Sequence, residues 1–411
     1  MAAAHMEAIG LDEPLNWPTR VVMLIGGLMV TIALSALTPV LPQIETALAR
    51  TEDEKLLVKM LIPIVGATMV IGAPLTGYLI QRVGLRIILA AHSLIFAVAG
   101  TAGFYLGNLE MLLVLRLFVG LSAAGMATIS MTLINTRLQD NDRARWMGFH
   151  IAAAMLGALV VHPIVGLLGE LGWRWPFLAY GASLILTFVA LAGAQEAGKA
   201  APADPEGPRE ERNPLKWFPL WFLPFALVMG SVTYLPTVYL PFVARDVGVM
   251  SPAVISMIML ADVIIGASMS LIFGWSQRRI SSETAFIISF AFTGTGMVIV
   301  SLATGLTGVF AGMLVFGFGI GWFVPNLMTA LSRRVTQAQQ GPAVGIIKGA
   351  HYLASPLAIL AVEPIARAFG PAGAMMAGAV ASFAVVATFI ALTASGAVRL
   401  RPPIEETVPA E

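Results

Sequence analysis

Long apolar runs separated by short polar turns make up most of this sequence. Each run is roughly 20 residues long, which is enough to cross the hydrocarbon core of a bilayer as an α-helix. In the first half the runs lie at 21–44, 57–80, 87–106, 111–134, 147–168 and 175–194; in the second half they lie at 217–243, 253–275, 285–306, 309–331, 343–365 and 372–398. The pattern predicts an all-α membrane protein with twelve transmembrane helices.

One stretch, residues 195–216, breaks this rhythm because it is rich in acids, bases and prolines. Such a composition is typical of a solvated linker. We therefore expect an N-terminal tail at 1–14 that begins with vector-derived residues, a six-helix bundle at 15–194, a cytoplasmic linker at 195–216, a second six-helix bundle at 217–398 and a cytoplasmic tail at 399–411.

Lysine and arginine fall mainly on one side of this predicted topology. If the N-terminus is cytoplasmic, the outer ends of the helices carry only Arg50, Lys55, Lys59, Arg174, Arg245 and Arg367. Cytoplasmic loops of membrane proteins are enriched in Lys and Arg. The distribution predicts that both termini and the linker are cytoplasmic, and we expect the protein in a bacterial inner (plasma) membrane.

Composition narrows the function classes further. Hydrophobic residues make up 58% of the chain and charged residues 11%, the net charge is +1, and Cys is absent. These values argue against a nucleic-acid partner, which needs concentrated Lys and Arg, and they exclude disulfides, thiol nucleophiles and Cys-ligated metals. The histidines lack the spacing of a metal motif, and no nucleophile and base stand together. We expect no metal, no cofactor and no enzymatic activity.

The two halves resemble each other at a spacing of about two hundred residues. Thr38 and Pro42 correspond to Thr237 and Pro241, and His150 in the predicted fifth helix corresponds to His351 in the eleventh. Many secondary transporters are built from such internal repeats. The correspondence predicts two pseudo-symmetric bundles of six helices.

A short basic turn joins the second and third apolar runs and contains Gly77, Gln81, Arg82, Gly84 and Arg86. The two glycines are expected to allow close backbone approach, and the arginines to stay in water on the cytoplasmic side. This stretch resembles the loop signature between helices 2 and 3 of the major facilitator superfamily. Gln81 stands where that family usually has Asp, so an amide hydrogen bond would replace the charged latch of the loop.

Two further stretches are similar to the same superfamily. Arg116 to Ala124 follows its helix 4 pattern, and residues 172–177 match the turn between helices 5 and 6. The resemblance includes the twelve-helix drug:proton antiporter-like branch, although helix 5 keeps only Pro163 and Gly166 of that branch's motif. It implies transport by alternating access, and for Arg116 a part in proton relay or in holding the helices around the cavity.

Ionisable residues at bilayer depth are few. Burying one costs about 2.5–3.5 kcal/mol, so each needs a partner or a wet cavity. Asp262 lies near the middle of the eighth predicted helix and is a candidate proton acceptor, because burial favours the neutral acid and a nearby cation favours the charged form. The alternatives are a permanent structural partner of Lys348 or Arg116, or an acid kept neutral by lipid.

Lys348, His351 and Tyr352 share one face of the predicted eleventh helix. A lysine ammonium would neutralise an anionic group of a solute, and His351 would donate or release a proton. The alternative is that both cations lie near the cytoplasmic end of the helix and reach toward the surface. For His162 and Glu363, each before a proline, the simple role is to bond carbonyls that the prolines free.

Uncharged polar residues at helical spacing are candidates for the cavity lining and substrate contact: Thr31, Ser35 and Thr38; Ser231, Tyr234 and Thr237; and Trp322 and Asn326. A polar stripe on a helix surrounded by lipid is expected to face a cavity or another helix. Hydrogen bonding between helices is the alternative for these Ser and Thr hydroxyls.

Together these observations predict a monomeric secondary transporter that moves a small amphipathic or anionic organic solute, with protons and lipid as its other partners. Proton-coupled efflux or exchange is the preferred direction. The alternatives are an uptake symporter or uniporter for an organic anion, and a membrane sensor on the same fold that transports nothing.

Overall fold

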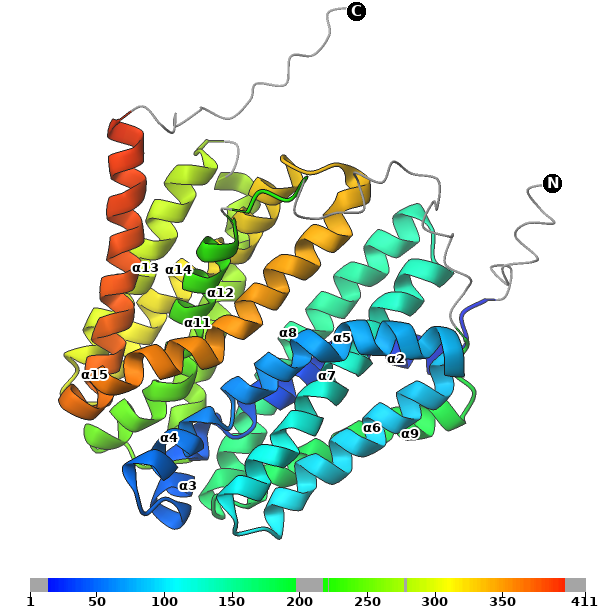
Figure 1. Ribbon diagram of the computed structural model, residues 1–411, viewed down its shortest axis with the longest axis horizontal. Helices are drawn as coiled ribbons and strands as arrows, with labels where there is room; N and C mark the ends of the chain where they lie inside the picture. Colours follow the sequence, from blue (N-terminus) through cyan, green and yellow to red (C-terminus); the bar gives the residue numbers. More distant parts are fainter. Residues whose placement is uncertain (1–13, 197–216, 221, 277–278, 396–411) are drawn as a thin grey trace, which may run out of the picture. The chain divides into compact units, whose positions relative to one another are not determined.

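The computed structural model describes residues 14–196, 217–220, 222–276 and 279–395. The chain divides into two compact units (Figure 1): unit 1 comprises Met1–Lys216 and Ser251–Met257, and unit 2 comprises Trp217–Met250 and Ile258–Glu411. The predicted tails and nearly all of the predicted linker lie outside the described residues.

Unit 1 is a bundle of helices in which α5 packs on α7, and α2 packs on both α7 and α8. Figure 1 shows α6 and α9 side by side within this unit, in agreement with their contacts. Its elements are α2 (Trp17–Ser35), η1 (Thr38–Val40), α3 (Leu41–Leu48), α4 (Glu52–Met60), α5 (Pro63–Val83), α6 (Leu85–Thr101), η2 (Ala102–Phe104), α7 (Leu109–Arg137), α8 (Asp140–Glu170), η3 (Trp175–Ser183) and α9 (Leu184–Leu191).

Unit 2 contains α11 (Phe222–Asp246), α12 (Pro252–Ser276, whose first turns belong to unit 1), α13 (Ser282–Ser301), α14 (Leu306–Ser332) and α15 (Gln337–Ala394). Helix α11 packs on α15, and α13 packs on α14 and α15. Five phenylalanines join four of these helices, with ring centroids 4.6–6.5 Å apart: Phe225, Phe286, Phe290, Phe323 and Phe389. Phe286, Phe290 and Phe323 of this aromatic cluster are buried in the core of the unit.

The predicted twelve helices are confirmed. Ten helices among the described residues are long and apolar enough to span a membrane, and Trp175–Leu191 is a shorter apolar helix. Helix α15 supplies two spans, because Gly370 has a φ of 72° and breaks it, as the bend between the orange and red segments of Figure 1 shows. Glycine adopts this left-handed conformation without the steric cost that a side chain would add.

Prolines explain where the first two predicted helices differ from the observed ones. The run at 21–44 is divided by the short 3-10 turn η1, which contains Pro39, and α3 then begins with Pro42 near its N-terminus. The run at 57–80 is divided in the same way, between the end of α4 at Met60 and the start of α5 at Pro63. Proline lacks an N–H and is therefore placed at the first turn of a helix rather than inside it.

The basic turn between α5 and α6 is a single residue, Gly84, with a φ of 100°. A Cβ would meet nothing within 4 Å at Gly77, and at Gly84 it would meet only side-chain atoms of Glu196 at 3.6 Å or more, so the expectation of close backbone approach is wrong for both glycines. The carboxylate of Glu196 accepts the Leu85 N–H at 2.6 Å, and the Glu196 carbonyl accepts from Arg137 Nε at 2.8 Å. An acid from the end of unit 1 thus caps α6, while Gln81 is exposed.

Candidate functional site

Four polar side chains from two helices come together in unit 2. Lys348, His351 and Tyr352 lie on α15, and Tyr234 lies on α11. The rings of Tyr234 and His351 are 5.3 Å apart at an interplanar angle of 47°, and those of His351 and Tyr352 are 6.0 Å apart. Lys348 precedes His351 by three residues and Tyr352 by four, so these three side chains share one side of α15. The sequence-predicted group of α15 therefore extends to the predicted Tyr234 of α11.

A glycine sets the distance between these two helices. A Cβ at Gly230 of α11 would lie 2.5 Å from the His351 carbonyl oxygen and 2.6 Å from the Ala354 Cβ. Real Cβ atoms do not come this close, so only glycine allows this approach of α11 to α15. Because Tyr234 follows Gly230 by one helical turn, this approach places its ring against His351. The sequence pattern did not single out Gly230.

Lys348 lies deeper in its helix than the sequence indicated. Helix α15 begins at Gln337, not near residue 343, so Lys348 is eleven residues, or about 16 Å, from the helix start. This depth weakens the alternative in which Lys348 simply reaches from a helix end to the surface.

The rotation of α15 also separates Lys348 from the lipid. Lys348 is exposed in the structure, and so are Leu353, Leu357 and Leu360. At about 100° per residue, the three leucines lie roughly on the opposite side of the helix from Lys348. Lys348 is therefore not on the apolar surface of α15 that suits acyl chains.

Asp262 is partly buried near the middle of α12. A Cβ at Gly317 of α14 would lie 2.6 Å from the Asp262 carbonyl oxygen, and one at Gly321 would lie 2.4 Å from the Gly266 carbonyl, so this face of α12 packs on α14. The exposed Leu271 lies nine residues, or two and a half turns, after Asp262, which puts it on the opposite side of α12. Asp262 thus points away from the lipid side. Among the described side chains of unit 2, no ion pair joins it to Lys348.

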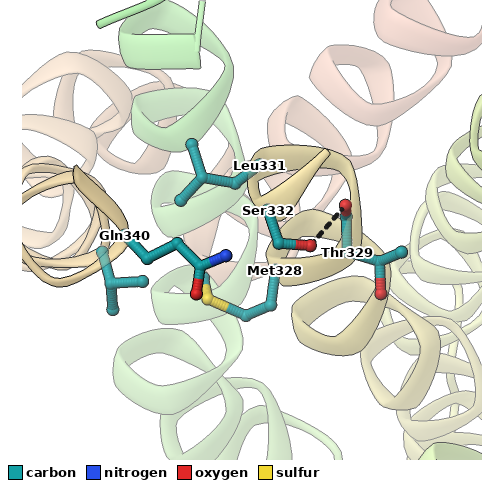
Figure 2. Close-up of a pocket in the computed structure, with 6 residues that line it drawn as sticks. Met328, Thr329, Leu331, Ser332 and Gln340 are labelled. Carbon is teal, nitrogen blue, oxygen red and sulfur yellow. Dashed lines mark hydrogen bonds between the residues drawn. The ribbon is translucent and has the colours of Figure 1, made fainter. Parts of the chain in front are cut away.

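A pocket of about 290 Å³ lies where α14 ends and α15 begins, within unit 2 (Figure 2). Its lining comes from both helices: Met328, Thr329, Leu331, Ser332, Gln340 and Val344. Gln340 and Val344 precede Lys348 by eight and four residues, so they continue its side of α15. The sequence contains this spacing, but Gln340 and Val344 were not predicted as site residues, because an amide or an apolar side chain is not conspicuous in a membrane helix.

The predicted polar stripes bond mainly to their own helices. Ser35, Thr38 and Ser231 each donate to the carbonyl four residues earlier, at 2.5, 3.5 and 2.8 Å. Thr31 reaches the Ala154 carbonyl of α8 at 3.5 Å. Thr237 is partly buried. The expected bonding between helices is therefore limited to Thr31 among these four hydroxyls.

Trp322 and Asn326 lie inside unit 2. Asn326 is fully buried and its amide donates to the Ser282 carbonyl at 2.8 Å, which ties α14 to α13. Trp322 packs against Phe273 and Phe318, with centroids 6.0 Å apart in each case. No hydrogen bond or ring contact joins either residue to Lys348, His351, Tyr352 or Tyr234 within the described part of the chain.

Arg116 belongs to unit 1 and is only 1% exposed. Its Nη1 donates to the Tyr180 hydroxyl at 2.6 Å, and the guanidinium lies 4.5 Å from the Tyr180 ring centroid and 5.3 Å from that of Phe177. These contacts connect α7 to η3. Cβ atoms at Gly100 and Gly103 would lie 2.2 and 2.0 Å from atoms of Tyr180 and Phe177, so the two glycines make room for both rings. The arrangement favours the role of holding helices together.

The remaining ionisable residues lie apart from the Lys348 group. His150 contacts the Met23 carbonyl at 2.7 Å, and His92 contacts the Thr76 hydroxyl at 3.0 Å. His162 is buried and makes no hydrogen bond within the described residues, so its expected bond to a carbonyl freed by Pro163 is not formed. Glu363 instead accepts from Tyr239 at 3.0 Å. No cluster that could hold a metal occurs in the described part of the chain.

Sequence comparison decides the family of this chain. The sequence profile of the Major Facilitator Superfamily matches residues 23–359. The chain belongs to this superfamily. It is an integral membrane transporter of small solutes and not an enzyme, and the predicted resemblance to the superfamily is confirmed.

Two curated relatives match part of this transporter. A bacillibactin exporter of Bacillus subtilis is 34% identical over 157 residues, which is 36% of this chain and 38% of the exporter. The niacin transporter NiaP of Acinetobacter baylyi is 29% identical over 125 residues, which is 29% of this chain and 28% of that protein. The matched segments span less than two fifths of either relative.

Solved structures match over most of the transporter. A D-xylose-proton symporter aligns with a TM-score of 0.69 at 16% identity, covering 90% of this chain and 97% of the symporter. A point mutant of the nucleoside transporter NupG aligns with a TM-score of 0.72 at 14% identity, covering 91% of this chain and 99% of that protein. At these identities the similarity establishes the fold and nothing finer.

Proposed function

We propose that this transporter moves a small organic solute with an anionic group by alternating access, coupled to protons, as efflux or exchange. The observation that carries the proposal is the group in unit 2: an exposed Lys348 on the non-lipid side of α15, next to His351, Tyr352 and Tyr234. A cation at bilayer depth is retained where a wet cavity and a ligand stabilise it.

Lys348 is the anion-binding residue in this proposal. No acidic side chain pairs with it among the described residues, so its ammonium can be neutralised by a carboxylate of the solute. The rings of Tyr234, His351 and Tyr352 add apolar and polar surface beside it, which suits an amphipathic solute. Thr31, Ser35, Thr38, Ser231 and Thr237 are proposed to contribute the milder polar lining.

Asp262 is the proton carrier in this proposal. It is the acid in the middle of α12, it points away from lipid, and no ion pair to Lys348 fixes its charge among the described side chains. Its proton affinity therefore depends on how much water reaches it, which changes as a transporter alternates its access. His351 is proposed to assist. Arg116 is assigned to structure, because Tyr180 and Phe177 occupy its surroundings.

The efflux direction has support in the relatives, because one of them is named an exporter. The other is named a niacin transporter, which keeps uptake of a solute by this fold as the second candidate. We further propose that the protein acts as a monomer in the bacterial inner membrane with both termini in the cytoplasm, in accordance with the distribution of Lys and Arg.

Transport in proteoliposomes tests this function. A panel of radiolabelled organic anions, cations and neutral solutes is offered under a pH gradient of either sign. Anions should accumulate under one sign, and wild-type counterflow exchange should occur without a gradient. Absence of flux for every solute would contradict transport and favour the sensor function, while flux indifferent to the gradient would contradict proton coupling.

A further inference from the structure

We propose that the pocket in Figure 2 holds the apolar body of the same solute whose anionic group binds Lys348, so that the substrate class is an amphipathic carboxylate. This inference rests on the proposed transport function and adds a second subsite to it. The first subsite is the ammonium of Lys348, and the second is the pocket between the end of α14 and the start of α15.

The two subsites are continuous along α15. Val344 lies one turn before Lys348 and Gln340 lies two turns before it, which corresponds to about 6 and 12 Å along the helix axis. All three lie on the side of α15 away from Leu353 and Leu357. One extended molecule of moderate length can therefore contact both the pocket and the ammonium.

The lining of the pocket indicates what kind of group it receives. Met328, Leu331 and Val344 supply apolar surface. The Thr329 hydroxyl already donates to the Pro325 carbonyl at 2.9 Å, and the Ser332 hydroxyl donates to the Thr329 carbonyl at 3.0 Å. Both hydroxyl protons already have acceptors within α14, so neither hydroxyl needs a hydrogen-bond acceptor from a ligand.

Gln340 is the polar residue of the pocket lining whose side-chain amide can form a hydrogen bond with a ligand. In Figure 2 its amide and the Met328 side chain extend toward each other from α15 and α14. The pocket therefore suits a hydrocarbon or aromatic body with at most one or two polar substituents. Methionine next to this amide is an adaptable wall, which tolerates variation in the shape of that body.

The volume of the pocket gives the scale of the group that it can receive. At about 30 Å³ for each water-sized group, 290 Å³ corresponds to roughly ten such groups. A carboxylate at Lys348 with a body of roughly six to eight carbon atoms fits this volume and the distance along α15. A lipid acyl chain is the other conceivable occupant, but the pocket shares the side of α15 that carries Lys348, not the side of the exposed leucines.

Calorimetric titration of the purified full chain in detergent with straight-chain monocarboxylates of three to twelve carbons tests the inference. Burying one methylene is expected to tighten binding about threefold to fourfold, so affinity should rise with chain length and then level off. Matched alcohols of the same lengths should bind far more weakly, because they lack the charge that pairs with Lys348.

Variants separate the two subsites. Val344→Phe fills the pocket and should remove the gain from chain length, while Met328→Ala enlarges it and should move the levelling-off to a longer acid. Lys348→Met should lower the affinity for every length. Leu353→Phe, on the opposite side of the same helix, is the matched control and should behave as wild type. Thermal unfolding shows that each variant is folded.

The outcomes distinguish failure of this inference from failure of the proposed function. If carboxylates bind and are transported but chain length has no effect, or if Val344→Phe keeps the full gain, the pocket assignment is wrong and transport stands. If affinity rises with length but proteoliposomes show no flux, the pocket stands and transport fails. If length matters equally for alcohols and acids, a lipid-like site replaces the proposed one.

Discussion

His150 in unit 1 and His351 in unit 2 occupy corresponding positions of the internal repeat, yet their surroundings differ. Each lies opposite a glycine of a neighbouring helix, Gly27 of α2 for His150 and Gly230 of α11 for His351. His150 is held by a main-chain carbonyl, that of Met23. His351 faces the ring of Tyr234, and its Nδ1 has no hydrogen-bond partner among the described residues.

A similar contrast holds for one cation of each unit, Arg116 and Lys348. Arg116 of unit 1 is enclosed by Tyr180 and Phe177 and reaches no solvent, whereas Lys348 of unit 2 is exposed and unpaired within the described residues. The difference teaches that the two halves of a duplicated chain can keep one fold while dividing its tasks. Arg116 and His150 of unit 1 are held by contacts within their unit, and we propose that Lys348 and His351 of unit 2 are the groups that meet ligand and proton.

The strongest test of this division is Asp262→Asn in unit 2. The amide cannot exchange a proton, so accumulation driven by a pH gradient should be lost entirely, while counterflow exchange of the solute continues. Radiolabelled flux in proteoliposomes measures both. Unchanged accumulation in this variant would remove Asp262 from the coupling mechanism.

Gly100→Leu should give the largest structural effect in unit 1. Its Cβ would lie 2.2 Å from that of Tyr180, so the ring that holds Arg116 must move, at a cost of about 3 kcal/mol or more in the free energy of unfolding. Gly148→Ala is the control, because a Cβ at Gly148 of α8 meets nothing within 4 Å. Chemical unfolding in detergent compares the two, and equal loss in both would contradict the packing described for Tyr180.

Replacing each cation by methionine should sharpen the comparison of the units. Lys348→Met should lower the affinity for an anionic solute roughly 10- to 100-fold, the usual worth of a hydrogen bond to a charged group, with little change in melting temperature. Arg116→Met should instead lower the melting temperature. Binding titrations and thermal unfolding on both variants are the measurements, and the reverse pattern would show that the roles of the two cations are exchanged.

Tyr180→Phe should have a smaller effect. It keeps the aromatic face next to Arg116 and removes the hydroxyl that accepts from Nη1, which is expected to cost about 1–3 kcal/mol because a buried donor loses its partner. Tyr352→Phe in unit 2 makes a useful counterpart, since it should alter solute affinity and not stability. Equilibrium unfolding of both variants measures the difference in stability, and a binding titration of Tyr352→Phe measures its solute affinity.

The smallest expected effect concerns the two histidines. His150→Phe should cost about 1 kcal/mol of stability through the lost contact to the Met23 carbonyl. His351→Phe should leave stability nearly unchanged, because the ring contact with Tyr234 is kept, and should change the pH profile of solute affinity. If the pH profile follows His150 instead, the division between the units is wrong.

Part of the candidate site could be predicted from the sequence. Charged residues in an apolar run are conspicuous, so Asp262, Lys348 and Arg116 were identified directly, and the i, i+3 and i, i+4 spacing put His351 and Tyr352 near Lys348. Gly230 and Val344 were missed, because small and apolar residues occur throughout membrane helices and do not mark a site. The resemblance to the superfamily assigned Arg116 two possible roles, and only its contacts favour one.

The sequence by itself determined the number of helices, their approximate limits and the membership of the superfamily. These depend on local properties, such as the length of an apolar run, the position of proline and the residues of a loop motif. Only the tertiary structure decided that Lys348 shares a group with Tyr234, that Arg116 is enclosed by aromatic rings, and that a pocket precedes Lys348. Such facts depend on how each helix is rotated and how closely glycines let it approach its neighbour, and hydropathy along one chain does not record either quantity.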